Sequence, residues 1–517
     1  MLRKNFNTSI VLSSVQTFSN RRKDMKRILT LLLVGLFSMG CLASASAESN
    51  IDVKVKGQWL FQYGIVGNSG FDKNGDRNGR HRNDDNTISA QRVRTQVNFI
   101  ISENLQAVLQ FEIGDIWHGR GGASGRGAGG QLGADGVNVE TKHAYLDWMV
   151  PETGLHIRMG LQNLALPALW GGNVFNDDVA AVVASYKFND MFALTAFWAR
   201  PYDQFRNDGN LTAAQGGGAR SYDDEVDAFG LILPISLDGV TITPWVMYAS
   251  VGAASGLYDA TGAGTPFGGS TGYTDGGNTS SAPAWWLGTL AQVNMFDPLT
   301  FGVEFIYGYL GRNDVFGDAT RASKFEVSTR GWYLAATLDY KLDWGTPGIF
   351  GWYASGDDHK DWRNHSRLGR LPTVRPDQNY SSFGSDGGLN VADEYLLGDN
   401  NAGTWGLGIQ IKDMSFIKDL SHTVKFIYYQ GTNDHKMVTN TNFSHDQLAN
   451  LSKAVNYLTT KDHAYEINFD HRYMIYENLA AVLELGYAWI DRSERVWGND
   501  FQDNGAYKAV LGFEFRF

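Results

Sequence analysis

The sequence predicts an all-β protein, a transmembrane antiparallel β-barrel of 18 strands, with 16 strands as the alternative. Three observations indicate this fold: segments of alternating apolar and polar residues, short connections that alternate with long ones, and an aromatic-rich, charge-poor composition. The 517 residues include 15 Trp, 23 Tyr and 29 Phe, yet only 19% are charged. In a barrel that faces lipid, such side chains form the outer wall and its aromatic girdles.

The amino terminus has the features of a secretory signal peptide. Met25-Lys26-Arg27 precedes a ten-residue, largely apolar region, 28–37, and a small-residue stretch follows. That apolar run is too short for a membrane helix, which needs about 20 residues. We therefore expect residues 1–24 to be an over-long start and residues 25–47 to be a signal peptide cleaved near Ala47-Glu48. A lipoprotein cleavage before Cys41 is the alternative, but residues 38–40 lack the aliphatic residue that such sites prefer.

Residues 48–517 are expected to form one barrel domain, because period-two alternation recurs along them. Residues 51–63, 93–101 and 465–470 alternate, and the last strand is the clearest, with apolar side chains at every odd position from Tyr507 to Phe517. One apolar and one polar face is the pattern of a strand between lipid and water. The inward faces are expected to carry charges of both signs, including those of Glu304, Arg330, Lys425, Glu466, Asp470 and Glu484.

Aromatic residues recur near the predicted strand ends, where they are expected to form interfacial girdles. The set comprises Trp148, Trp198, Tyr248, Trp285, Tyr309, Trp344, Trp352, Tyr428 and Trp489.

The connections decide the type of barrel. Short turns are predicted at 102–104, 151–154, 189–190, 237–239, 297–298, 343–345, 413–421 and 476–478. Long polar loops separate them, at 66–86, 117–137, 163–178, 201–224, 251–283, 312–326, 357–402, 433–462 and 492–505. Short periplasmic turns and long extracellular loops are typical of outer-membrane barrels. The sequence therefore predicts a location in the outer membrane of a Gram-negative cell.

Other classes of protein fit less well. A propeller would repeat every 40–50 residues or so, and no such repeat is visible. A formal charge of −11 argues against nucleic acid as a partner. A single Cys argues against a disulfide framework and a thiolate metal site.

Three stretches resemble the outer-membrane homotrimeric porins of sulfate-reducing bacteria. They are IDVKVKGQWLFQYG (51–64), SENLQAVLQFEIGD (102–115) and GADGVNVETKHAYLDWMVPETGLHIRMGLQNLALP (133–167), and the likeness is closest in the first third of the barrel. The terminal Phe517 also resembles the ends of outer-membrane proteins. The resemblance implies a general porin-like homotrimer that passes small hydrophilic solutes and ions by diffusion, surrounded by outer-membrane lipid and lipopolysaccharide. A channel selective for a sugar or a small organic anion is the alternative.

The loop 163–178 is the candidate pore constriction. In general porins the loop after the fifth strand folds into the lumen, and this loop has the same place. Its apolar side chains need a packing partner, which an inward fold provides; they are Leu164, Leu166, Leu169 and Trp170. A surface loop that packs on a neighbouring subunit is the alternative.

Fixed charges are expected around this constriction. Asp177 and Asp178 would contribute negative charge from the loop. Residues expected to face them from neighbouring strands are Arg92, Arg94, Glu112, His156 and Arg158. Charges in a narrow aqueous pore set ion preference.

The remaining motifs favour loops rather than chemistry. Residues 72–86 resemble a calcium loop, but Arg77 and Asn83 stand where Gly and Glu belong. The Gly-rich 119–130 lacks the ending of a phosphate loop. Residues 444–458 have the spacing of a short amphipathic helix that would cover a pore mouth. We find no Gly-x-Ser-x-Gly between a strand and a helix and no His-Glu-x-x-His, so neither an enzyme nor a cofactor is expected.

Overall fold

The computed structural model describes residues 51–68, 86–118, 139–203, 225–252, 281–316, 324–365, 367–385, 387–389, 401–439, 457–498 and 505–517. All of them belong to one compact unit, Ile51–Phe517. The signal peptide, the Gly-rich stretch 119–130, and nearly all of the calcium-like loop and the 444–458 segment lie outside these residues.

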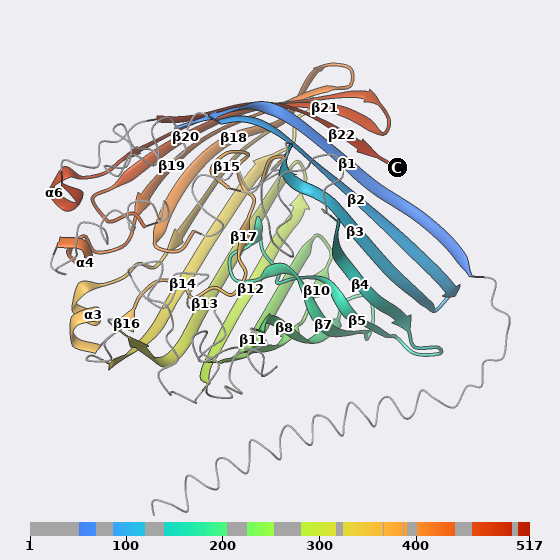
Figure 1. Cartoon of the computed structure of the whole chain (residues 1–517), viewed down its shortest axis with the longest axis horizontal. Helices are drawn as coiled ribbons and strands as arrows, with labels where there is room; N and C mark the ends of the chain where they lie inside the picture. Colours follow the sequence, from blue (N-terminus) through green and yellow to red (C-terminus); the bar gives the residue numbers. More distant parts are fainter. Residues whose placement is uncertain are drawn as a thin grey trace, which may run out of the picture. The chain divides into compact units, whose positions relative to one another are not determined.

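The described residues form a closed antiparallel barrel of 18 strands, which confirms the predicted fold class (Figure 1). The strands are β1 (Asp52–Gly67), β2 (Asn86–Ser102), β3 (Leu105–Trp117), β4 (Val139–Met149), β5 (Leu155–Ala165), β7 (Asn176–Lys187), β8 (Ala193–Asp203), β9 (Glu225–Ile232) with β10 (Ile235–Leu237), β11 (Val240–Val251), β12 (Ala282–Phe296), β13 (Leu299–Phe316), β14 (Lys324–Tyr340), β15 (Thr346–Ala354), β18 (Thr404–Ile417), β19 (Leu420–Gly431), β20 (His463–Tyr476), β21 (Leu479–Asp491) and β22 (Gly505–Arg516). Each pairs with the next, and β22 pairs with β1, for example Gln58 with Arg516. β9 and β10 count as one strand, interrupted at Pro234, which has no N–H for the ladder.

Smaller elements occupy the long loops. β6 (Gly171–Gly172) pairs with β17 (Asp377–Gln378), and β16 (Arg367–Leu368) runs parallel to β14. The short helices α3 (His359–His365), α4 (Lys436–Thr439) and α6 (Glu494–Trp497) lie at one end of the barrel (Figure 1). No helix in the described part of the chain is long and apolar enough to cross a membrane.

The outer wall follows the predicted alternation. Large apolar side chains stand exposed at every second position, among them Trp59, Ile409, Ile467 and Leu511. Because each strand turns one face outward, these side chains form a continuous apolar surface around the barrel.

The inner wall departs from the prediction over about half of the barrel. Many inward-facing residues from β8 to β15 are apolar and buried, and they include large side chains, among them Phe197, Trp245, Trp286, Tyr333 and Phe350. Trp352 also lies inside, only 4% exposed, so its placement in an outer girdle is wrong. Arg330, predicted to face the lumen, is exposed beside outward-facing neighbours. The inner apolar residues are buried because two loops fold onto them.

The first inserted loop is the one predicted to enter the lumen, and that prediction is confirmed. The Trp170 ring packs against the inward-facing ring of Phe350, with ring centroids 5.4 Å apart. It also packs against the ring of Tyr380 in the second inserted loop, with centroids 6.1 Å apart. The Leu169 amide donates to Oε2 of Glu304 on β13 at 2.9 Å. The predicted bounds of the loop were too wide, because β5 extends to Ala165 and β7 begins at Asn176.

The second inserted loop was not foreseen. We call residues 369–385 and 387–389 the strap, because this segment lies along the inner wall. Trp286 Nε1 donates to the Pro372 carbonyl at 2.8 Å, and Tyr202 Oη donates to the Val374 carbonyl at 3.0 Å. Burial raises the pKa of Tyr380 well above its ordinary value, so this phenol stays neutral.

Charged side chains of the inner wall bind the strap directly. Lys508 Nζ donates to the Ser382 carbonyl at 3.0 Å, and Lys425 Nζ donates to that of Tyr380. Carboxylates accept from strap donors: Glu466 from the Gly384 amide at 3.1 Å, Glu484 from the Leu389 amide at 2.6 Å, and Asp470 from Ser382 Oγ at 2.9 Å. Of these residues, Lys425, Glu466, Asp470 and Glu484 were predicted to line the lumen. Instead they hold a buried polypeptide segment, which satisfies their hydrogen bonds.

Candidate pore passage

A cavity of about 1030 Å³ remains between the inserted loops and the wall built by β1–β5, β7 and β22. Its lining is rich in ionisable side chains of both signs: Lys56, Arg92, Arg94, Lys142, His143, Asp177, Asp178, Arg375, Asp377 and Arg516. Four of the seven predicted constriction residues are therefore part of this lining, namely Arg92, Arg94, Asp177 and Asp178.

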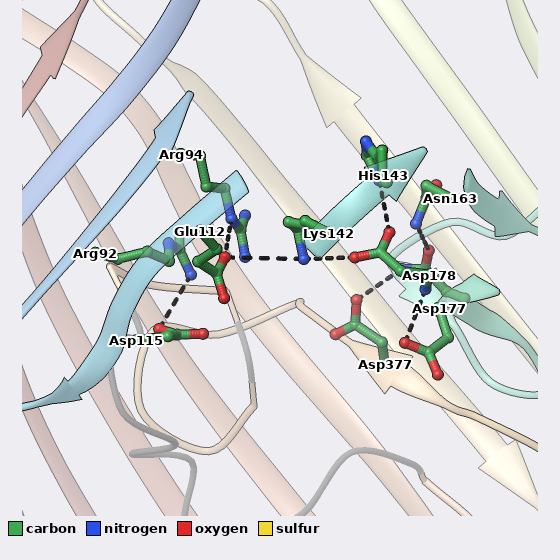
Figure 2. A network of polar contacts seen from close by, with 11 residues as sticks. Arg92, Arg94, Glu112, Asp115, Lys142, His143, Asn163, Asp177, Asp178 and Asp377 are labelled. Atoms are coloured by element: carbon green, nitrogen blue, oxygen red, sulfur yellow. Dashed lines mark hydrogen bonds and ion pairs between the residues drawn. The ribbon is translucent and has the colours of Figure 1, made fainter. Parts of the chain in front are cut away.

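A chain of alternating charges runs along one side of the passage (Figure 2). The Arg94 guanidinium donates to Glu112, and Lys142 Nζ lies 3.9 Å from the same carboxylate. Lys142 Nζ also lies 2.5 Å from Asp178 Oδ2, and His143 Nε2 donates to Asp178 Oδ1 at 2.9 Å. Lys142 thus links Glu112, which is buried behind the surface of the cavity, to Asp178 on its surface.

β-bulges place these side chains on the lumen side. The β3–β4 register shifts between Gln110 and Phe111, so Lys142 is the extra residue opposite them and shares the passage with its neighbour His143. A second shift, where Arg92 pairs with Gly114, leaves Asp115 unmatched with a φ of 56°. The Asp115 carboxylate consequently comes within 3.4 Å of Arg92 Nη1.

Asp177 and Asp178 belong to the start of β7, not to a loop as predicted. Asp177 connects the barrel wall to the strap, because its Oδ2 lies 3.2 Å from Nε of Arg375. The Arg375 guanidinium also lies over the Tyr202 ring, 4.5 Å from its centroid. Nearby, Asn176 Nδ2 donates to Asp377 of the strap at 2.6 Å.

Two predicted constriction residues lie elsewhere. His156 and Arg158 are near the short turn 151–154 and do not line the cavity. His156 Nε2 donates to Asp147, and the Arg158 guanidinium lies 6.0 Å from the Tyr145 ring centroid. Both residues lie near the end of β5 that adjoins the short turn, whereas Asn163, near the other end of this strand, lines the cavity. Their position along the strand therefore keeps them out of the lining.

Four residues that line the passage were not predicted to do so: Lys142, His143, Arg375 and Asp377. Lys142 and His143 stand in the stretch 133–167, where two adjacent basic residues interrupt the alternation and could have signalled a bulge. No sequence signal marks Arg375 or Asp377, since their loop has no periodicity. In the described part of the chain, no three His, Cys, Asp or Glu side chains gather as metal ligands would.

Comparison with known proteins yields similarity at the level of whole structures alone. No protein-family model and no curated protein matches the chain. It is similar to the outer membrane protein OprD from Pseudomonas aeruginosa, with 11% identity over 92% of this chain and 98% of that one and a TM-score of 0.47. OccAB2 from Acinetobacter baumannii gives 12% identity, coverage of 91% and 100%, and a TM-score of 0.48. Similarity this weak carries no information on the solute, and the resemblance to porins of sulfate-reducing bacteria stays a prediction.

Proposed function

We propose that this protein is an outer-membrane porin, a passive diffusion channel for small hydrophilic solutes and ions. The observation that carries the proposal is the charged cavity of about 1030 Å³ inside a closed barrel with an apolar outer wall. An apolar outer wall suits lipid, and a polar interior suits water and solutes.

The chemistry of the passage supports diffusion rather than tight binding. Its fixed charges are largely matched within the protein, since Arg94, Lys142 and Arg375 each lie beside a carboxylate. A small solute therefore meets polar groups that exchange readily with water, without a deep charged trap. Conduction requires that binding be weak enough for release.

Planar-bilayer recording of the purified protein tests this proposal. We expect ohmic single-channel conductance that rises with salt concentration. Added sugars or organic anions should not block this conductance in a saturable way. Absence of any conductance would refute the channel and favour a structural barrel with a plugged lumen.

A substrate-selective channel is the second candidate. It is favoured by the inserted loops, which fill the lumen beside β8–β15 and confine the passage to one side, where a solute must pass Arg375 and Lys142. Saturable block by one class of solute, sugar or organic anion, would support selectivity over general diffusion.

We also propose that the barrel assembles as a homotrimer, as the sequence resemblance implies. Native mass spectrometry of detergent-extracted protein tests the assembly. A mass of three chains is expected, and a mass of one chain at all protein concentrations would refute it.

A further inference from the structure

A second cavity, of about 500 Å³, lies among the long loops, away from the passage. It is lined by His359, Lys360, Arg363 and Asn364 of α3 and by Asp434 and Lys436 at the start of α4. Figure 1 places both helices at the same end of the barrel. Three of these six residues are permanent cations, in a chain whose formal charge is −11.

The cavity has a fixed framework. Oδ1 of Asp358 accepts from the Lys360 amide at 2.7 Å and from the Asp361 amide at 3.2 Å, which fixes the first turn of α3. Trp362 of α3 packs against Leu368 and Met437, both buried. This apolar contact joins α3 to α4 and keeps their cationic residues around one space.

Lys360, Arg363 and Lys436 are exposed at the rim of the cavity, and none of them has a partner of opposite charge within the described residues. No described side chain forms an ion pair or hydrogen bond with Lys360 Nζ, the Arg363 guanidinium or Lys436 Nζ. By contrast, the neighbouring Arg367 lies 2.6 Å from Asp361. The cavity's one carboxylate, Asp434, already accepts from the Lys436 amide at 3.0 Å and lies 3.4 Å from His435.

We propose that this cavity binds a phosphate-bearing anion. Like charges around one cavity repel, and a multivalent oxyanion lowers that repulsion while it accepts hydrogen bonds from Lys and Arg. Arg presents two parallel N–H groups that match phosphate oxygens, whereas Lys acts as a point charge. A single carboxylate would satisfy only one of these cations, so the set favours phosphate.

Two sources could supply this chemistry: the phosphates of lipopolysaccharide or a soluble phosphate ester. Phosphate binding itself does not depend on the proposed channel. Only the lipid source rests on the proposed outer-membrane location.

Titration calorimetry with inorganic pyrophosphate tests the site, using the full-length protein in detergent. We expect Lys360→Gln/Arg363→Gln to weaken binding about tenfold or more, since two charge-assisted contacts are lost. Lys461→Gln/Arg495→Gln is the matched control, because it removes two exposed cations from the same end of the barrel and changes net charge equally. Its affinity should stay within about twofold of wild type. Equal affinities in all three proteins, or no binding to the wild type, would overturn the site.

Competition then identifies the source. Lipid A in mixed micelles should displace pyrophosphate if the ligand is lipopolysaccharide, and glucose 6-phosphate should displace it if the ligand is a soluble ester. Displacement by neither overturns a phosphate-bearing ligand. Lys360→Gln/Arg363→Gln should have the same single-channel conductance as wild type. A failure of the channel proposal would therefore be seen in the conductance, and a failure of this site in the calorimetry.

Discussion

Replacing Lys508 with Met should release the strap from the barrel wall. Lys508 Nζ lies 2.8 Å from Glu484 Oε2, and the two side chains are only 2% and 4% exposed. The same ammonium donates to the Ser382 carbonyl of the strap. Met keeps the length and apolar stem of Lys but removes the charge and every donor, which leaves the Glu484 charge buried beside the strap.

The expected magnitude follows from this burial. Breaking a buried ion pair by removing one partner costs about 3–5 kcal/mol, because the other charge remains uncompensated. That corresponds to a change of about 10²- to 4 × 10³-fold in the equilibrium between seated and released strap. A strap that is almost always seated in the wild type should therefore be released for a measurable fraction of the time in Lys508→Met.

Single-channel recording is the assay, since the strap fills lumen space that would otherwise conduct. Lys508→Met should show larger or fluctuating conductance. The double variant Glu484→Gln/Lys508→Met should restore most of the steady wild-type level, because it leaves no buried charge and keeps an acceptor for the Leu389 amide. Wild-type conductance and noise in Lys508→Met would refute the idea that this pair holds the strap.

Three further predictions concern the passage and the inserted loops. Asp177→Asn/Asp178→Asn should shift the reversal potential in a salt gradient toward anions, whereas an unchanged potential would remove both residues from the conduction path. Gly331→Val should displace the strap, because even a Cβ at this position would lie 2.3 Å from the Leu371 amide nitrogen. Single-channel conductance should therefore rise, and wild-type conductance would contradict this prediction. Trp170→Ala should destabilise the barrel by about 0.5–3 kcal/mol, because the partly buried ring loses its packing partners. The measurement is the thermal midpoint, and unaltered stability would be the contrary outcome.

The sequence was sufficient for the barrel but not for its contents. Strand number and the positions of the short turns follow from alternation, because a strand between lipid and an interior must show two unlike faces. Alternation does not say what covers the inner face. Trp352 has the same sequence context as an aromatic residue of an outer girdle, yet it packs on Tyr380 of the strap, with ring centroids 4.9 Å apart.

The site was partly predictable for a related reason. Arg92 and Arg94 line the cavity, as alternation predicts for inward-facing residues, because regular pairing extends from β1 into β2. Lys142 was not predicted to face the lumen, because β4 contains one extra residue at the bulge. This residue reverses which side chains of the strand point inward and which point outward. Arg375 reaches the passage through a loop contact between segments about 200 residues apart, which local pattern cannot encode.

The position of the passage has a consequence for how the protein is made. Lys56 of β1 and Arg516 beside the chain end both line it, and β1 and β22 are the strands whose pairing closes the barrel. One wall of the passage therefore exists only after the first strand has joined the last. A barrel arrested before that joining would lack a complete conduction path, so the onset of conductance during refolding reports completion of biogenesis rather than membrane insertion.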